Sequence, residues 1–208
     1  MRIKISGSQR RYFVDDLRLT PADAWLEAKL HEHRFRSIDR AANAIESAGW
    51  VTLGIPSATR FGLEEIWYDD FLCLGLRVDR KRLPANALRV RLLELLDAER
   101  SSQGLGSVAR DRRQELRDKL ESELFKRAIP STQLYQVVWA AARGELFFSS
   151  TSESANSAFV TLFSRTFGRT PVPAFPGLAA KRAELPAAHR RRLSQVVPAW
   201  FAAEQAVG

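Results

Sequence analysis

Residues 66–78 read Ile-Trp-Tyr-Asp-Asp-Phe-Leu-Cys-Leu-Gly-Leu-Arg-Val, and this stretch decides the fold of the chain. Two apolar runs flank Asp69-Asp70, which predicts two β-strands joined by a tight acidic turn. The second run, residues 71–78, is apolar almost throughout. Such continuity is typical of a strand that is covered on both faces, so we expect this strand to be central in a sheet.

A helical hairpin is expected immediately after this strand. Leu83-Pro84 ends the strand, and four leucines then recur at helical spacing: Leu88, Leu92, Leu95 and Leu96. Residues 101–106 interrupt this helix. A second, highly charged helix runs from Ser107 to Pro130 and carries three leucines on one side: Leu116, Leu120 and Leu124. Two helices joined by a short Ser/Gly loop predict a hairpin that protrudes over residues 84–129.

The flanking segments predict further strands and helices. One strand is expected to end at Val14, and others to span residues 49–53, 133–142 and 145–149. Capping boxes predict two helix starts, one from Thr20 with Asp23 and one from Ser150 with Glu153. The second of these helices has four inward-facing apolar residues and ends at a glycine: Ala155, Phe159, Leu162, Phe163 and Gly168. Beyond it, three prolines are expected to break regular structure: Pro171, Pro173 and Pro176.

These elements predict an α+β fold, with an antiparallel or mixed sheet, packed helices and an inserted long helical hairpin. We expect one domain over residues 1–176 and a basic C-terminal tail over residues 177–208. The hydrophobic content of 45% is sufficient for a real core. The longest purely apolar stretch, residues 137–142, is far shorter than the roughly 20 residues of a membrane span.

The N-terminus has no apolar stretch of signal-peptide length, and Cys73 is the only cysteine, so no intrachain disulfide is expected. Both features favour the cytoplasm. The formal net charge is +8, and three windows carry an excess of positive charge: residues 77–91 with +5, 107–127 with +2 and 177–208 with +3, while the rest of the chain is net negative. Concentrated positive charge indicates an anionic partner, and nucleic acid is the leading candidate.

Ten basic residues are the predicted DNA contacts: Arg77, Arg80, Lys81, Arg82, Arg110, Arg112, Arg113, Arg117, Lys119 and Arg127. Residues 77–91 join a strand end to a helix start, from which long side chains can reach phosphates. On the charged helix, Arg112, Lys119 and Lys126 lie within roughly 40° of one another at about 100° per residue. The alternative is an ordinary solvated surface, supported by the i,i+4 pairs Glu115–Lys119 and Glu123–Arg127.

Signals for catalysis or metal binding are weak. His31 and His33 are two residues apart, so on a helix they do not converge on one metal. Asp69 and Asp70 are adjacent on a turn and point apart, and Glu27-Ala28-Lys29 matches only a fragment of a nuclease motif. No phosphate-binding loop, nucleophile elbow or zinc spacing is present in the sequence. We therefore expect no metal, no cofactor and no enzymatic activity.

Four tryptophans lie inside predicted elements and are expected in the core: Trp25, Trp50, Trp67 and Trp139. Cys73 is expected to be a buried, inert thiol. Trp200 and Phe201 in the tail have two open interpretations. They either cover a sheet edge or form a dimer contact.

Several segments of the sequence follow one another in an order that matches a known family. An apolar strand, a charged turn, a Lys-x-Leu-Pro step and a helix start occupy residues 71–84. The other matching segments are Gly49-Trp50-Val51, residues 123–129, Val138-Trp139, the helix over 154–167 and the Gly-x-x-Pro-Val-Pro stretch over 168–173. In order and spacing, over roughly residues 9–175, the chain resembles the RdgC family of recombination-associated proteins.

The resemblance implies a homodimer that closes into a ring around double-stranded DNA and binds it without sequence preference. It also implies that the protein limits access of the RecA recombinase, and that it is cytoplasmic and associated with the nucleoid. The basic channel of the family would map onto Lys81 and Arg127 with their neighbours, and Ile129 onto a dimer contact.

The chain departs from the family pattern at two positions and in length. Lys126 stands where the family has proline, and Ile129 where it has an aromatic residue. Family members usually continue well beyond the Pro-Val-Pro stretch with a domain that closes the ring. The chain is therefore expected to be a short form that lacks most of the usual C-terminal region.

Three functions follow, in order of preference. The first is a non-enzymatic, sequence-nonspecific DNA-binding protein that modulates homologous recombination. The second is a protein-interaction module that has lost DNA binding and kept an acidic partner. The third is a metal-dependent nuclease that uses Asp69 or Asp70.

Overall fold

Strand β4 (Phe71–Arg80) organises the fold, as its apolar sequence predicts. The computed structural model describes residues 7–38, 44–104, 107–183 and 185–195. In it, β4 pairs with β2 (Glu46–Thr52), β3 (Trp67–Tyr68) and β5 (Ser131–Ala140). Three more strands extend the sheet beyond β5, in the order β6 (Glu145–Phe148), β1 (Arg10–Phe13) and β7 (Val172–Pro173). Every pairing between these strands is antiparallel.

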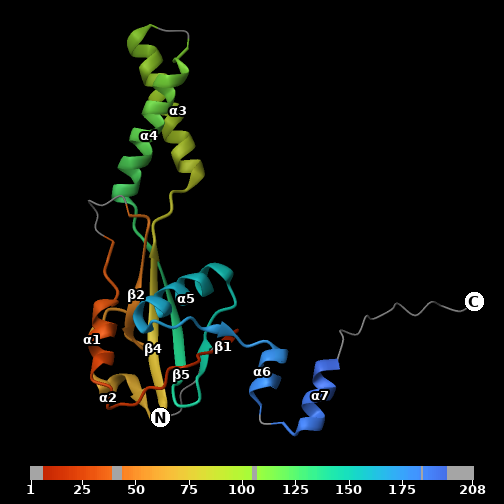
Figure 1. Ribbon diagram of the computed structural model, residues 1–208. Coiled ribbons are helices and arrows are strands. Elements are labelled where there is room, and N and C mark those ends of the chain that lie inside the picture. Colours follow the sequence, from red (N-terminus) through yellow and green to blue (C-terminus); the bar gives the residue numbers. More distant parts are fainter. Residues whose placement is uncertain (1–6, 39–43, 105–106, 184, 196–208) are drawn as a thin grey trace, which may run out of the picture.

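The main hydrophobic core lies between one face of this sheet and the helices α1 (Trp25–Glu32) and α5 (Glu153–Phe167) (Figure 1). The short helix α2 (Leu63–Ile66) adds Ile66 to the same cluster. Aromatic rings fix α5 on the sheet. Phe148 stacks on Phe159 with 4.6 Å between ring centroids, and Trp139 meets Phe163 edge-on at 5.2 Å. Such pairs stabilise a core beyond the area that they bury.

The predicted helical hairpin is present and projects from one end of the sheet (Figure 1). It consists of α3 (Ala85–Gln103) and α4 (Arg110–Arg127). The strands β4 and β5 lead directly into and out of it, because Arg80 pairs with Ser131 at the last position of their ladder. Helices of 19 and 18 residues extend about 27 Å at 1.5 Å per residue.

The C-terminal segment contains two short helices, α6 (Pro176–Arg182) and α7 (Ala187–Gln195). Arg182 attaches α6 to the sheet edge, because its guanidinium lies 4.4 Å from the ring centroid of Phe13 and forms an ion pair with Asp15. Trp200 and Phe201 lie outside the described residues, so both interpretations of them remain predictions. Within the part of the chain that is described, no helix is long and apolar enough to cross a membrane.

Several predicted local features are confirmed. Asp69 and Asp70 form the turn between β3 and β4, and Gly144 turns the chain between β5 and β6 with a φ of +67°. Gly168 ends α5 in the left-handed conformation that glycine adopts most easily. The four inward-facing residues of α5 are all buried.

Both predicted capping boxes are wrong. The carboxylate of Asp23 accepts hydrogen bonds from the Thr20 backbone N–H and hydroxyl, but this makes a turn, and α1 begins only at Trp25. At α5 the N-cap residue is Ser152, without a side-chain cap hydrogen bond, and Glu153 pairs instead with Arg10 at 2.8 Å.

Two other expectations need correction. Trp25 is 41% exposed, and therefore does not belong to the core, whereas Trp50 and Trp139 do. The prolines after α5 do not abolish regular structure. Pro173 lies in the two-residue strand β7, and Pro176 starts α6, where its missing N–H costs nothing.

Candidate nucleic-acid interface

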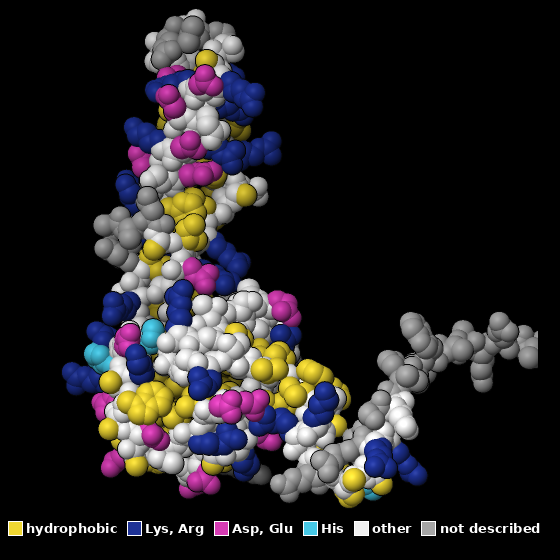
Figure 2. All heavy atoms as spheres, in the orientation of Figure 1, with side chains coloured by type: hydrophobic (Ala, Val, Ile, Leu, Met, Phe, Trp, Pro, Cys, Tyr) yellow, Lys and Arg dark blue, Asp and Glu magenta, His cyan; other side chains and the backbone are white. Residues whose placement is uncertain are grey.

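The helical hairpin presents most of the predicted DNA contacts. The leucine stripes of its two helices face each other, so that Leu96 and Leu120 are 4% and 8% exposed. Since two helices bury only their facing sides, the remaining sides of α4 stay in solvent. All seven basic residues of α4 are exposed. Figure 2 shows Lys and Arg side chains along the hairpin, interspersed with acidic ones.

Some of these cations form ion pairs with acidic neighbours. Arg112 donates to Glu99 of α3 at 2.8 Å and to Glu115 at 3.1 Å, and Arg117 donates to Glu121 at 3.0 Å. Both carboxylates raise the pKa of Arg112, Glu99 more than Glu115. The contact with Glu99 also joins α3 to α4. These two arginines therefore stabilise the hairpin in addition to any role toward DNA. The predicted pairs Glu115–Lys119 and Glu123–Arg127 are absent among the described residues.

The cations that remain are the best candidates for phosphate contacts. Among the described residues, seven exposed bases of the hairpin and its base form no ion pair: Arg82, Arg89, Arg110, Arg113, Lys119, Lys126 and Arg127. An unpaired cation gives up only water when it meets a phosphate, and it releases the counterions of the DNA. Five of these seven residues are among the predicted contacts.

The unpaired cations of α4 lie on two different sides of the hairpin. At about 100° per residue, Lys119 and Lys126 lie roughly 160° around the helix from Arg110 and Arg113. The leucine stripe that contacts α3 lies between Arg110 and Lys119 around the helix, and Arg113 falls within its angular range, one turn before Leu116. We call Arg110 and Arg113 the first strip, and Lys119 and Lys126 the second strip. One duplex lying against the hairpin can contact only one strip closely.

The structure gives the predicted contacts at the end of β4 other partners. Arg77 is held by both carboxylate oxygens of Asp79 at 2.8 and 2.9 Å and lies over the ring of Phe35. Arg80 donates to Glu46 on the neighbouring strand at 2.6 Å. The carboxylates of Asp79 and Glu46 raise the pKa values of Arg77 and Arg80, respectively. These two arginines hold the base of the hairpin, and DNA contact by them remains a prediction.

Lys81 is buried, with 3% of its surface exposed. Its backbone N–H donates to the Ile45 carbonyl at 2.8 Å, which fixes the chain where β4 ends. The next residue, Arg82, is exposed. We expected the strand-to-helix junction to present all its cations to solvent, and this expectation is wrong for Lys81. In extended chain, successive side chains point to opposite faces, so Lys81 and Arg82 cannot both face solvent on the same side. Ile129, the predicted dimer contact, is 90% exposed.

The ten predicted contacts leave out three basic residues: Arg89, Lys126 and Arg165. Arg89 and Lys126 are unpaired among the described residues of the hairpin, and Lys126 was left out although its helical angle placed it beside Lys119. In addition, Arg80 and Arg165 line a groove of about 540 Å³ with three hydroxyl residues of α5: Ser154, Ser157 and Thr161. The available signal was charge, since residues 154–183 contain four basic residues and no acidic one.

The residues examined for metal binding or catalysis lie in ordinary structural contacts. Arg34 Nη1 lies 2.7 Å from His31 Nδ1, and His33 Nε2 lies 3.9 Å from Glu32. Asp69 is a turn residue with a φ of +50°. Across the described ranges, no three His, Cys, Asp or Glu side chains gather in a way that could hold a metal ion. Burial raises the pKa of the Cys73 thiol to about 12.

The family comparison fits this geometry. The model of the family described as "Putative exonuclease, RdgC" matches residues 13–186, which include the sheet from the last residue of β1 onward, the helical hairpin and α6. A search of curated proteins finds no match. The family is associated with DNA and with recombination, in agreement with the concentration of unpaired cations on the hairpin. Since the match covers well over half of its length, the chain belongs to the RdgC family.

Proposed function

We propose that the protein binds double-stranded DNA without sequence specificity and modulates homologous recombination by occupying DNA and limiting recombinase access. It acts by binding and catalyses no reaction. The observation that carries this proposal is a set of seven exposed cations, unpaired among the described residues, on and beside a hairpin that projects away from the body of the protein.

Contacts between such cations and phosphates are independent of base sequence, because every nucleotide carries the same phosphate. The acidic residues on the same helices favour moderate affinity, and the phosphate contacts make that affinity fall as salt rises. Arg112 and Arg117, already held by carboxylates, are expected to contribute less than the unpaired residues. The proposal therefore ranks Arg82, Arg110, Arg113, Lys119 and Arg127 above Arg77, Arg80 and Lys81.

The finer parts of the proposal come from the family. By analogy with it, two copies associate into a homodimer that encircles DNA, antagonise the RecA recombinase and act in the cytoplasm at the nucleoid. The Ile129 side chain, 90% exposed at the base of the hairpin, is available for a contact between copies.

The test is fluorescence anisotropy with labelled duplexes of unrelated sequence over a salt series. Arg82→Glu with Arg127→Glu is the test variant, and Lys81 is left intact because it is buried. Arg60→Glu with Arg143→Glu is the matched control. It changes the charge equally at the opposite end of the sheet from the hairpin. We expect a loss of affinity of at least tenfold in the test variant and less than threefold in the control, both folded by circular dichroism.

Equal losses in the two variants would mean that net charge alone drives binding, and would refute a site on the hairpin. Incubation of plasmid with magnesium or manganese provides a test of the nuclease alternative. Cleavage that Asp70→Ala abolishes would replace the non-enzymatic proposal.

A protein-interaction function is the second candidate, because several large apolar side chains of the hairpin are exposed. Val90 is 54% exposed, Leu93 49% and Leu95 39%. A partner bound to these residues through α3 would not be displaced by excess duplex. A partner that competes with duplex would favour the DNA-binding proposal.

A further inference from the structure

The upper half of β5 has an unpaired edge. β5 spans ten residues, but β6 pairs only with Val137 to Ala140. Beyond these pairs, Ser149 alone continues the contact: its backbone N–H donates to the Gln136 carbonyl at 3.0 Å, and its hydroxyl accepts from the Gln136 N–H at 2.7 Å. The backbone groups of Gln136 therefore point away from β4, toward the side on which β6 lies.

The same direction follows for Thr132 and Leu134, because alternate residues of a strand direct their N–H and C=O groups to the same side. None of these four backbone groups hydrogen-bonds to another described residue. Residues 131–134 are all exposed, and Leu134 is 49% exposed. The edge from Ser131 to Tyr135 is thus open over the length of a short strand.

Two other edges of the sheet are protected. Along β2, the Phe35 N–H donates to the Trp50 carbonyl at 2.8 Å, and the Trp50 N–H donates to the His33 carbonyl at 3.1 Å. At the far edge, β7 is two residues long and contains Pro173. Coverage, shortness and proline are the usual means by which proteins prevent pairing with other chains. The sequence Ser-Thr-Gln-Leu-Tyr of residues 131–135 has no proline and no charge.

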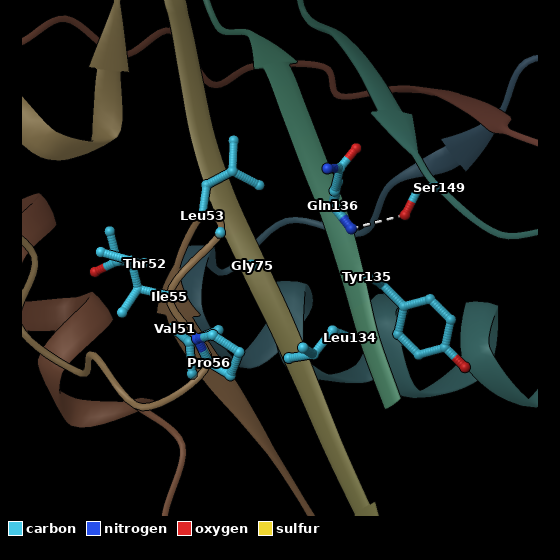
Figure 3. A pocket seen from close by; sticks show the side chains of 11 residues that line it. Val51, Thr52, Leu53, Ile55, Pro56, Gly75, Leu134, Tyr135, Gln136 and Ser149 are labelled. Carbon is cyan, nitrogen blue, oxygen red and sulfur yellow. Dashed lines mark hydrogen bonds between the residues drawn. The ribbon is translucent and has the colours of Figure 1, made fainter. Parts of the chain in front are cut away.

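A hollow of about 300 Å³ lies beside this edge, on the sheet face opposite α5. Figure 3 shows Leu134 and Gln136 on one side of it, Ile55 and Pro56 on the other, and Gly75 of β4 between them. Gly75 leaves the hollow without a side chain from the central strand. The Oε1 atom of Gln136 is buried and has no hydrogen-bond partner within the part of the chain that the structure describes. A buried acceptor without a donor is costly.

We propose that this edge binds an extended peptide segment of a partner protein by strand addition. The peptide pairs antiparallel or parallel with Thr132 and Leu134, in the space that continues the line of β6. Its residue opposite Leu134 is apolar and packs against the Leu134 side chain, because directly opposed side chains lie about 5 Å apart.

An extended peptide is the occupant that fits, because the four free groups alternate along the strand as a β-ladder requires. Nucleic acid does not supply alternating amide donors and acceptors at this spacing. The edge carries no charged residue between Ser131 and Tyr135, so phosphate has no cation to meet there. The proposal is therefore independent of the DNA-binding function of the hairpin.

The test uses synthetic, acetylated hexapeptides in which valine, isoleucine or leucine alternates with threonine or lysine. Binding to the full chain is followed by NMR, through the hydrogen exchange of the Thr132 and Leu134 amides. The control peptides have the same sequences but carry N-methyl groups on the pairing amides. We expect slower exchange at both amides with the parent peptides and no change with the methylated ones.

Leu134→Pro is the key variant. The Leu134 N–H makes no ladder bond to β4, so proline is tolerated at this edge position while it removes a donor and blocks pairing. Peptide affinity should fall about tenfold or more, whereas Leu134→Ala, which keeps the donor, should lose less. Duplex binding should stay unchanged in both variants, so a failure here is separate from a failure of the DNA-binding proposal.

Three results would overturn the inference. They are no saturable binding of any panel peptide at millimolar concentration, equal binding of methylated and parent peptides, or equal affinity in Leu134→Pro. A dimer that forms without peptide and that Leu134→Pro abolishes would assign the edge to a second copy of the chain instead.

Discussion

The two strips of α4 give a sharp prediction about how the hairpin meets DNA. Arg110 and Arg113 lie roughly 160° around the helix from Lys119 and Lys126, and neither strip has an ion pair among the described residues. Since the hairpin is only two helices thick, a duplex on one side leaves the other strip in solvent. Neutralising one strip should therefore weaken binding, and neutralising the other should not.

The expected magnitude follows from counterion release. Each phosphate contact contributes about 0.9 to the slope of log affinity against log salt, so two lost contacts lower the slope by about 1.8. Between 50 and 200 mM salt, the affinity of such a variant should therefore fall by a factor about tenfold smaller than the affinity of the parent protein. The variants are Arg110→Gln with Arg113→Gln and Lys119→Gln with Lys126→Gln, since glutamine keeps good helix propensity.

Fluorescence anisotropy with one duplex over that salt range measures both slopes. A change of about 1.8 in one double variant and less than about 0.5 in the other would support one-sided contact. Equal changes in both would refute it, because they would require the duplex to touch opposite sides of the hairpin. Circular dichroism at 222 nm checks that the two variants retain their helix content.

Three further outcomes test the body of the protein. Tyr12→Phe should lower the free energy of unfolding by about 1–3 kcal/mol in urea titrations, because the Tyr12 hydroxyl donates to Asn156 Oδ1 at 2.5 Å in the core. Gly49→Ala should cost about 1–3 kcal/mol, because its Cβ would overlap the neighbouring backbone, whereas Gly62→Ala, which meets nothing closer than 3.6 Å, should be nearly neutral. The Cys73 thiol has a pKa raised by burial from 9.0 to about 12. Stability should therefore be lost as pH rises from about 9 toward 12, and a thiol reagent at pH 8 should react only in denaturant.

Local sequence signals predicted the elements of the fold well. The apolar run of β4, the acidic turn before it and the leucine spacing of the hairpin each depend on residues close together in the chain. The capping-box predictions were wrong because the motif is local and does not depend on a helix that follows it. A short motif such as Thr20 with Asp23 forms its hydrogen bonds equally well in a turn that no helix continues.

The candidate site was predicted only in part, because charge in a sequence does not indicate pairing. Arg80 meets Glu46, which is 34 residues away, and this contact depends on the register between β2 and β4. Lys81 is buried by the chain that passes Ile45. No local pattern separates these residues from Arg82 or Arg113, which stay unpaired.

The sequence by itself determined the α+β class, the central strand, the protruding hairpin and the concentration of positive charge, because each follows from periodicity or composition over a short window. Only the tertiary structure decided which cations remain free and which strand edge remains open. The edge of β5 is open because β6 ends at Phe148 and no other described element covers Thr132 and Leu134. Pairing and coverage are contacts between distant segments, and their free energy depends on the whole packing of the chain.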